Sequence, residues 1–598
     1  MRFKSAKKDG FQVFAVAGVN TISFGIVASA AARKGLLGFA VERVDPKSGE
    51  KYFVYGMKVF PSVIPNPDES TRVSTFDHPI QSFVWDDFTA KDGRDYVYNF
   101  YPVRGKPKNL DHSAEPVTID VKTEKLFTKG KHDIFFNRGV ASSQAYVREF
   151  HNRKPDQIAN PKERARALEW LSRSLDEALL AFIEQARPGD ELFGCFYEFR
   201  YEPAAQALAK AAKNGVKVRL IVDAKDNSYT DKKGTFHEAF PRKENLAMLK
   251  TIKLPKKHYV LREMRANDIQ HNKFMVLRRK GEALAAEVWT GSTNLSTGGV
   301  HGQTNVGHWV RDKDVAEAFC AYWTILQADP GAEDGQTSDG RAANKAFTKA
   351  VEELSPTLAD DDEIAEGITP IFSPRAGIKM LDRYVGMLSD ADSHACITLA
   401  FGVGAQFRES LLKNDNKSAL TFLLLEKEDK PNPNSKKKDE WLPINSKNNV
   451  YKAFGAYLQD AAYQFARETN ARMLEFNSHV AYIHSKFMLV DPLGTDPVVV
   501  TGSANFSEPS TRSNDENMII VRGDRRVADI YFTEFNRLFF HYYYRSVVEL
   551  TSRMRDDKPS TPKDAPQFLK EEPKEWLASY APGKFKDKRV VMYAGMTL

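Results

Sequence analysis

Cysteine and long hydrophobic runs are scarce in this sequence, and each shortage excludes a class of protein. Of the 598 residues, three are cysteines, Cys195, Cys320 and Cys396. Their spacing fits neither a disulfide framework nor a set of paired metal ligands. An apolar stretch over residues 22–40 is interrupted by Arg33 and Lys34, so it does not predict a membrane span. We therefore expect buried, reduced thiols, no metal and no other cofactor.

The first residues also lack the apolar segment of a signal peptide. We expect a cytoplasmic protein, or one exported by a route that needs no signal. The chain has 86 basic and 79 acidic residues and a net charge of +7. This mild excess favours an anionic partner without choosing between nucleic acid and acidic lipid. One dense basic cluster, Lys436–Lys438, stands among Pro and Asn and predicts a solvated loop.

One pattern occurs twice in the chain. A His-x-Lys-Phe-Met segment is followed, after a similar gap, by Thr-Gly-Ser-x-Asn, an apolar residue and a serine. The first copy comprises residues 271–275 and 290–296, and the second comprises residues 484–488 and 501–507. Because the spacing within the two copies is nearly the same, the sequence predicts a duplicated site.

The residue types in this pattern suit the cleavage of a phosphodiester. That reaction needs a nucleophile, an acid for the leaving alkoxide, and cations or donors for the non-bridging oxygens. Two histidines, two lysines, two serines and two asparagines supply these groups. Side chains two residues apart in a strand share a face. His271 and Lys273 should therefore point together, as should His484 and Lys486.

The pattern resembles the H-x-K-x4-D signature of the phospholipase D superfamily, over roughly residues 130 to 550. The second copy matches in full through His484, Lys486 and Asp491, and residues 514–517 (Asn-Asp-Glu-Asn) follow it. The resemblance implies two α/β sandwich halves related by a pseudo-twofold axis, with the motifs meeting at their interface. The catalytic residues that it implies are His271, Lys273, His484, Lys486, Asp491 and Glu516, and the phosphate-binding residues are Ser292, Asn294, Ser503 and Asn505.

Helix and strand patterns divide the chain into four parts. Short alternating runs separated by Gly, Pro and Asp predict an antiparallel β-sandwich over residues 1–125, which resembles fibronectin type III modules. Alternating helices and strands predict an α/β fold over residues 126–350 and again over residues 351–555. Residues 556–598 lack periodicity and predict an extended tail.

The resemblance also implies a mechanism, a two-step displacement through a phosphohistidine without a metal. One histidine attacks phosphorus, and the other protonates the leaving alcohol and then activates water or an acceptor alcohol. The resemblance gives the nucleophile to His271. A carboxylate that accepts a hydrogen bond from Nδ1 makes a histidine more basic, and the second half visibly supplies one in Glu516. We therefore expect His484 to be the more basic, unless Asp491 or Glu516 reaches across to His271.

The first copy departs from the signature, and this leaves alternatives open. Arg278 stands where the aspartate is expected, and residues 303–305 lack a carboxylate. One hypothesis is that the first motif has decayed and the chain is a binding or scaffolding protein. For an active enzyme, the motif resembles those of both cardiolipin hydrolases and small endonucleases. Two fused halves favour a phospholipid over DNA or RNA by a small margin, and both motifs in one chain predict a monomer.

Overall fold

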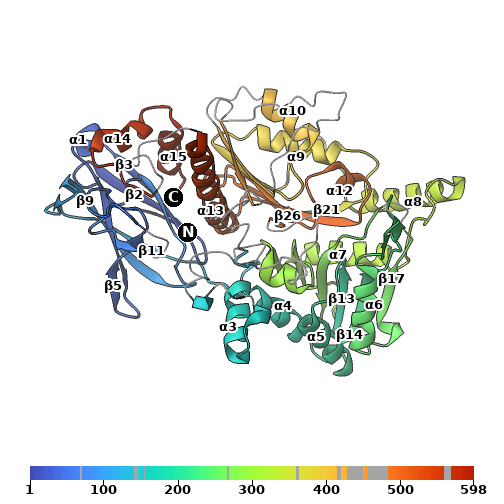
Figure 1. The fold of residues 1–598 in the computed structure, drawn as a ribbon. Coiled ribbons are helices and arrows are strands. Elements are labelled where there is room, and N and C mark those ends of the chain that lie inside the picture. The colour runs from blue at the N-terminus through green and yellow to red at the C-terminus, as the bar shows by residue number, and fades with distance from the viewer. Residues whose placement is uncertain are drawn as a thin grey trace.

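The computed structural model describes most of the chain. The described residues are 1–67, 71–139, 146, 149–151, 153, 155–232, 234–264, 268–358, 363–413, 419–426, 449–455, 483–557 and 567–598, without the side chains of residues 544–557. The predicted loop around Lys436–Lys438 lies outside them. Figure 1 shows a sheet-rich N-terminal part beside two α/β parts, with one long helix where the three meet.

Two antiparallel sheets form the N-terminal part. The first has the order β1-β2-β3-β8, and the second has the order β10-β9-β4-β5, with β11 also paired to β9. Side chains in β11 alternate between buried and exposed, as expected for a strand with one solvated face. Two layers of antiparallel strands agree with the predicted sandwich, whereas its likeness to fibronectin type III modules stays a prediction. The strands are β1 (Arg2–Lys4), β2 (Phe11–Ala17), β3 (Ile22–Ala28), β4 (Gly38–Asp45), β5 (Glu50–Phe53), β8 (Val84–Asp87), β9 (Asp95–Lys106), β10 (Asn109–Asp111) and β11 (Val117–Lys122).

The first α/β half is built on a seven-stranded mixed sheet. Its order is β12-β20-β19-β18-β13-β14-β17, in which β13, β14 and β17 run parallel and the other pairs are antiparallel. The strands are β12 (His132–Phe136), β13 (Glu191–Phe196), β14 (Lys217–Asp223), β17 (Tyr259–Arg262), β18 (Lys273–Arg278), β19 (Glu287–Gly291) and β20 (Val306–Val310). The helices are α3 (Pro161–Ser172), α4 (Leu175–Glu184), α5 (Glu202–Lys213), α6 (Arg242–Thr251) and α7 (Lys313–Leu326).

The second half repeats this topology strand for strand. Its sheet has the order β21-β27-β26-β25-β22-β23-β24, again with three parallel strands at one side. The strands are β21 (Gly367–Ser373), β22 (His394–Leu399), β23 (Leu420–Leu425), β24 (Val450–Phe454), β25 (Phe487–Val490), β26 (Val498–Gly502) and β27 (Glu516–Arg522). The helices are α9 (Lys379–Ser389), α10 (Ala405–Lys413) and α12 (Glu508–Arg512), and α8 (Ser338–Leu354) precedes the half. This repeat confirms the predicted α/β fold.

The two halves meet along matching elements. Helix α7 packs against its own sheet and against β21 of the other half. Two isolated bridges, Gln270 with Asp515 and Thr304 with Ile483, link the halves just before each motif histidine. The segment before each histidine is therefore tied to the partner half, which brings the two motifs to one interface.

The C-terminal segment differs from the extended tail that the sequence predicts. Residues 567–598 contain α14 (Pro573–Leu577) and α15 (Phe585–Ala594), which lie over the N-terminal sheets in Figure 1. The ring of Tyr593 is buried against Gly25 of β3, and the indole of Trp576 donates a hydrogen bond of 2.9 Å to the carbonyl of Leu36. These aromatic residues are few and widely spaced in a Lys-rich segment, so they form no helical period that could be recognised from the sequence.

Helix α13 (Arg525–Asp557) joins the parts into one body. It packs against β2 of the N-terminal part, β12 of the first half and β24 of the second. One continuous apolar cluster accordingly runs through all three, while a separate cluster fills the other face of the second sheet beneath α9 and α10. Among the described residues, every helix is too short or too polar to cross a membrane.

Candidate active site

Each motif histidine lies just before a central strand of its own half. His271 precedes β18 and His484 precedes β25, and both are buried, with 7% and 3% of their surfaces exposed. The following lysines, Lys273 and Lys486, are also buried, and each ammonium group donates to the carbonyl of its own histidine. The two-residue spacing thus keeps each lysine beside its histidine, as the sequence predicts.

The carboxylate of Glu516 crosses the interface to His271. Both of its oxygens lie 3.0 Å from Nδ1 of His271, and the backbone N–H of His271 donates to the carbonyl of Asp515 at 2.9 Å. The first half therefore takes its carboxylate from β27 of the second. The sequence predicts that His484 is the more basic histidine unless Asp491 or Glu516 reaches across to His271. Glu516 does reach across to His271.

On the other side, an amide takes the place of the carboxylate. The Nδ1 atom of His484 lies 2.8 Å from Oδ1 of Asn305, just before β20, and its backbone N–H donates to Oγ1 of Thr304 at 3.1 Å. An amide oxygen only accepts, so it holds the Nδ1–H tautomer of His484 and leaves Nε2 to exchange a proton. Sequence analysis recorded the absence of a carboxylate at residues 303–305 but missed this role of Asn305.

The two serines of the Gly-Ser-x-Asn segments contact these partners of the histidines. Ser292 donates to Oδ1 of Asn305 at 2.9 Å, and Ser503 donates to Oε2 of Glu516 at 2.7 Å. A hydroxyl has a single proton to donate, so neither serine has one left for a phosphate oxygen in this arrangement. The phosphate-binding role of Ser292 and Ser503 stays a prediction, and in this arrangement their hydroxyls orient Asn305 and Glu516.

The two asparagines of these segments have different surroundings. The amide of Asn294 donates to Oε1 of Glu198 at 2.6 Å. Among the described residues, the amide nitrogen of Asn505 has no such acceptor, whereas the Oδ1 atoms of Asn294 and Asn505 are alike in being buried without a hydrogen bond. Sequence analysis missed Glu198, because nothing in the motif pattern points to residues after β13.

Charge and burial act together on the four central side chains. Burial lowers the pKa of His271 to about 4, although Glu516 opposes this shift. Burial, followed by the charges of Lys486, Lys273 and His271, lowers the pKa of His484 well below its usual value. Burial thus favours the neutral form of both imidazoles in the empty site, and a carboxylate opposes this shift at His271. The contacts of His271 with Glu516 and of His484 with Asn305 place both motifs at one interface.

The lysines shift in the same direction. Burial lowers the pKa of Lys273 to about 8, with Glu516 and Glu198 opposing the shift. Burial and then Lys273 lower the pKa of Lys486 well below its usual value, and Glu516 opposes this shift. An anion between the two lysines would raise both pKa values. The empty site is therefore electrostatically prepared for an anionic ligand.

Asp491 lies away from the histidines, which contradicts the catalytic role that the sequence predicts for it. It follows β25, whereas His484 precedes that strand, so about seven strand residues or roughly 20 Å separate them. Its carboxylate accepts the backbone N–H groups of Asp392, Ser393 and His394 at 2.7–3.1 Å. It therefore fixes the turn before β22.

The departure at Arg278 is equally remote from the site. Arg278 ends β18, and its guanidinium forms ion pairs with Glu191 at 3.3 Å and Glu317 at 3.4 Å. The equivalent positions in both halves, Arg278 and Asp491, thus stabilise the ends of strands. The missing aspartate of the first motif removes nothing from the neighbourhood of His271.

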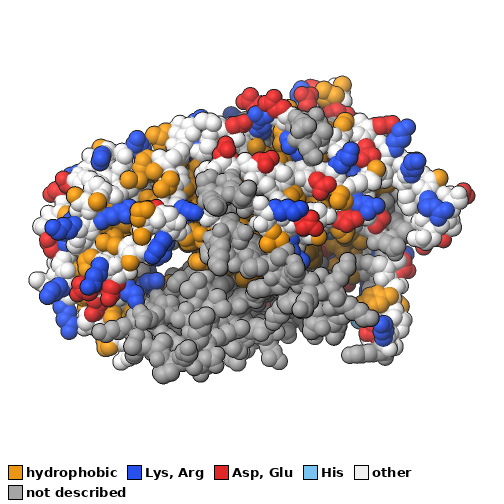
Figure 2. Space-filling model, turned by 90° about the horizontal axis from the view of Figure 1, so that it is seen from above, with side chains coloured by type: hydrophobic (Ala, Val, Ile, Leu, Met, Phe, Trp, Pro, Cys, Tyr) orange, Lys and Arg blue, Asp and Glu red, His pale blue; other side chains and the backbone are white. Residues whose placement is uncertain are grey.

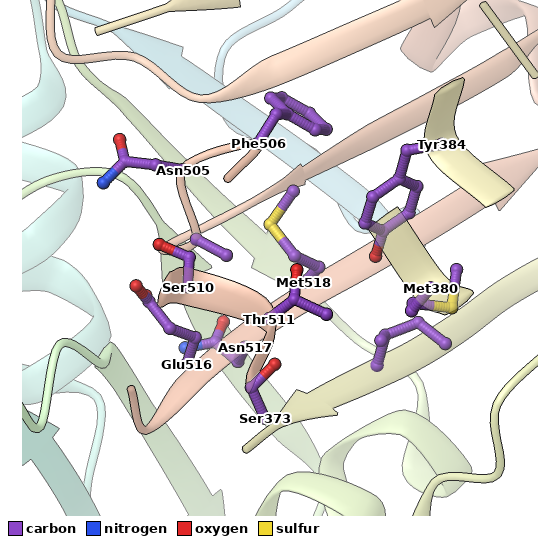
Figure 3. A pocket seen from close by; sticks show the side chains of 12 residues that line it. Ser373, Met380, Tyr384, Asn505, Phe506, Ser510, Thr511, Glu516, Asn517 and Met518 are labelled. Atoms are coloured by element: carbon purple, nitrogen blue, oxygen red, sulfur yellow. The ribbon is translucent and has the colours of Figure 1, made fainter. Parts of the chain in front are cut away.

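A small pocket lies behind Glu516 in the second half. Figure 3 shows Glu516 and Asn505 along one edge of this pocket and Met380 and Tyr384 of α9 along the opposite edge. The packing of α9 and Met518 shields this side of the carboxylate from water. Burial alone would raise the pKa of Glu516, but His271, Lys273 and Ser503 outweigh it and lower the pKa, so the carboxylate stays charged.

Comparison with known proteins identifies this duplicated α/β fold. The family model described as cardiolipin synthase, phospholipase D-like domain, matches residues 179–324 and 424–539. The mitochondrial cardiolipin hydrolase of Xenopus tropicalis is 44% identical over 61 residues, which are 10% of this chain and 27% of that protein. The chain thus spans about a quarter of the length of this curated relative.

Two solved structures are also similar. Phosphatidylserine synthase of Haemophilus influenzae Rd KW20 matches with 11% identity and a TM-score of 0.40, over 64% of this chain and 92% of that one. The phospholipase D family member Nuc of Salmonella typhimurium matches with 20% identity and a TM-score of 0.19, over 25% and 83%. On the two-part family match and the paired motifs, the chain belongs to the phospholipase D superfamily.

Proposed function

We propose that the protein is a phosphodiesterase that works through a phosphohistidine on His271, without a metal. The observation that carries the proposal is the unequal support of the two histidines. His271 contacts the charged Glu516, whereas His484 contacts the neutral Asn305. A carboxylate stabilises the positive charge that an attacking imidazole acquires. This asymmetry supports His271 as the nucleophile and His484 as the acid.

In the first step, Nε2 of neutral His271 attacks phosphorus, and the bond from phosphorus to the leaving oxygen breaks. The Nδ1–H of the resulting phosphoimidazolium stays hydrogen-bonded to Glu516, which offsets its charge. His484 donates the Nε2 proton to the departing alkoxide. Because the bound diester is anionic and lies beside Lys273 and Lys486, it raises the pKa of His484 so that this proton can be present.

The second step reverses these roles. Nε2 of His484, now neutral, takes a proton from water or from an acceptor alcohol, whose oxygen attacks the phosphorus on His271. The bond from phosphorus to Nε2 of His271 breaks, and the imidazole returns to its neutral form. Lys273, Lys486, Asn294 and Asn505 are the candidates for holding the non-bridging oxygens through both steps.

We propose a phospholipid as the substrate. Phe401, which is 52% exposed, follows β22 just past the strand residues that pair with β25. Tyr229 and Phe236 are also exposed, in a hairpin of β15 (Tyr229–Thr230) and β16 (Phe236–His237) that follows β14. The last residue of β14, Asp223, accepts the N–H of Gln270 beside His271. Exposed aromatic side chains in the segments that follow these two strands suit a lipid surface better than water.

An endonuclease is the alternative, which the net charge of +7 favours. A duplex would need a continuous basic surface along its backbone. On the described part of the face in Figure 2, basic and acidic side chains are interspersed instead. The relative named as a cardiolipin hydrolase also favours the lipid. The scaffold hypothesis loses its support, because Arg278 lies away from His271 and the first half receives Glu516.

The test of this proposal uses two sets of substrates in the presence of a chelator. Bis-p-nitrophenyl phosphate should be hydrolysed by the intact protein and should resist hydrolysis by His271→Ala. The protein is then incubated with each of four labelled substrates, and cleavage is measured. They are phosphatidylcholine vesicles, cardiolipin vesicles, single-stranded DNA and duplex DNA. Cleavage of a lipid is expected, whereas cleavage of DNA alone would overturn the lipid assignment. Loss of all turnover with chelator would overturn the metal-free reaction.

A further inference from the structure

Glu198 is a buried carboxylate beside the site that the proposed mechanism does not use. It stands two residues after β13, and 2% of its surface is exposed. One carboxylate oxygen accepts the amide of Asn294 at 2.6 Å, and the other accepts Nε and Nη2 of Arg200, each at 2.8 Å. A carboxylate buried to this extent costs free energy unless such partners satisfy it. Its position is therefore closely specified.

The contact with Glu198 also fixes the orientation of Asn294. A charged carboxylate only accepts hydrogen bonds, so the group of Asn294 that faces it must be the NH2 group. One N–H is then held by Glu198 and the second N–H has a fixed direction. Asn294 is thus preorganised before any ligand binds.

The second half lacks this arrangement. In the first sheet Phe196 lies opposite Lys273, and the register of β22 with β25 puts Leu399 opposite Lys486. The residue two positions after Leu399 is Phe401, which is therefore the counterpart of Glu198. Its exposed ring cannot accept a hydrogen bond from Asn505. Among the described residues, the hydrogen bond from the amide of Asn294 to Glu198 accordingly has no counterpart at Asn505.

The charges around Lys273 come from several elements. Glu198 and Cys195 approach it from the β13 side, Glu516 from β27 and Asp223 from β14, and each raises the pKa of Lys273 against the larger effect of burial. The ring of Tyr197 lies 5.4 Å from its ammonium group.

The carboxylates among these groups differ in charge. Burial raises the pKa of Asp223 to about 8, and Cys195 has a pKa well above its usual value for the same reason. Neither is therefore fully charged at neutral pH. Glu516, which is charged, already serves His271, and it acts on Lys486 as well. Glu198 is thus the carboxylate that distinguishes the lysine of the first half from that of the second.

We propose that Glu198 is a positioning residue that makes the two phosphate-binding pairs unequal. In the first half, Glu198 favours the charged form of Lys273 and orients the amide of Asn294. In the second half, Lys486 and Asn505 gain an anionic partner of their own only when the substrate binds. The inference rests on the proposed function, since it assigns these residues to the binding of a phosphodiester. On this proposal, the first half binds the phosphate before the chemical step.

The experiment compares Glu198→Gln with the intact protein across pH. Glutamine keeps an oxygen that can accept the amide of Asn294 but removes the charge. Without that charge the pKa of Lys273 falls, so the alkaline limb of kcat/KM for bis-p-nitrophenyl phosphate should move to lower pH by about one unit. At pH 8 this shift corresponds to a loss of about fivefold, which approaches about tenfold at higher pH. Glu198→Asp should retain the profile of the intact protein.

Glu191→Gln is the matched control. Glu191 begins the same strand, pairs with Lys217 and Arg278 and lies away from the site. The alkaline limb of kcat/KM should therefore stay at the same pH in Glu191→Gln as in the intact protein. Thermal unfolding of each variant shows whether it is folded. A Glu198→Gln profile that superimposes on that of the intact protein would overturn the proposal, as would an equal shift in Glu191→Gln.

A second measurement separates this inference from the proposed function. Tungstate, an anion that resembles phosphate, is titrated into each variant at several pH values. Its affinity should decline at a lower pH in Glu198→Gln than in the intact protein, and unchanged binding would again overturn the role of Glu198. Absence of turnover by the intact protein with this shift in binding would contradict the proposed function but support the role of Glu198.

Discussion

The pair formed by Glu516 and His271 gives the sharpest test of how the site works. Glu516→Gln keeps the size of the side chain and an oxygen for the Nδ1–H of His271, but it removes the negative charge from two contacts of 3.0 Å. It also lets the NH2 group of glutamine face Nδ1 and favour the wrong tautomer. In Ser-His-Asp triads, an equivalent change from acid to amide costs about 10⁴-fold in kcat.

The loss in kcat should be smaller here than in those triads, because glutamine can still orient the ring of His271 through its oxygen. We expect kcat to fall about 10³-fold, which corresponds to about 4 kcal/mol in the activation barrier. Single-turnover hydrolysis of bis-p-nitrophenyl phosphate measures the loss on the formation of the intermediate. Glu508→Gln is the control, since Glu508 lies on α12 nearby and pairs with exposed Arg512. A loss below about fivefold in Glu516→Gln would refute the assigned role of the carboxylate.

Three further predictions follow from the charges and contacts described. For bis-p-nitrophenyl phosphate, whose aryl leaving group needs little help from the acid His484, the pH profile of kcat/KM should be bell-shaped. Its acid limb should lie near the pKa of His271 at about 4, because His271 must be neutral to attack, and its alkaline limb near that of Lys273 at about 8. Initial rates are measured from pH 3 to 10, and a flat profile would contradict both assignments. Asp491→Ala removes the acceptor of three backbone N–H groups, so the free energy of unfolding should fall by about 1–3 kcal/mol while kcat stays within about twofold. Urea unfolding and steady-state rates measure the two effects, and a loss of kcat without a loss of stability would restore a catalytic role. Burial raises the pKa of Glu534, but Arg173 and Arg537 outweigh burial and lower it to about 2 from 4.5. The contribution of this depressed pKa to stability, roughly 3 kcal/mol, is therefore fully present above pH 4.5 and is lost as the pH falls toward 2. Glu534→Gln should remove it at pH 7, and urea unfolding at pH 7 and pH 3 would show a smaller difference from the intact protein at the lower pH.

The duplicated motif predicted the centre of the site well. Two His-x-Lys pairs with equal internal spacing can be read from the sequence alone, and the local geometry of a strand then places each lysine beside its histidine. The alternation of helices and strands likewise predicted both α/β halves. These features are local, so they depend little on how distant segments pack.

The partners of the histidines depend on contacts across the interface, and the sequence leaves those open. Glu516 lies 245 residues from His271 and supports the histidine of the other half rather than its own. At residues 303–305 the sequence shows only the lack of a carboxylate, whereas the amide oxygen of Asn305 supports His484. Glu198 belongs to no motif. A charged residue two positions after a buried strand is only a weak sign of a site.

The incorrect predictions for Asp491 and for the C-terminal segment have a common physical cause. Asp491 fits the family signature, but a position in a motif does not say whether a carboxylate faces a ligand or the backbone N–H groups of a turn. The C-terminal segment is rich in Lys and Pro, yet a few aromatic side chains suffice to bury α14 and α15 against the N-terminal sheets. Composition averages over such residues and therefore predicted a tail.

Trapping the covalent intermediate tests the central claim most directly. The intact protein, His271→Ala and His484→Ala are each mixed with a ³²P-labelled aryl phosphodiester, quenched under conditions that preserve phosphohistidine, and digested for peptide mapping. Because an aryl leaving group needs little help from an acid, His484→Ala should accumulate label on the peptide that contains His271, and His271→Ala should carry none. Label on the peptide that contains His484 would contradict the assignment of the nucleophile, and the absence of label from all three proteins under turnover would contradict the covalent mechanism.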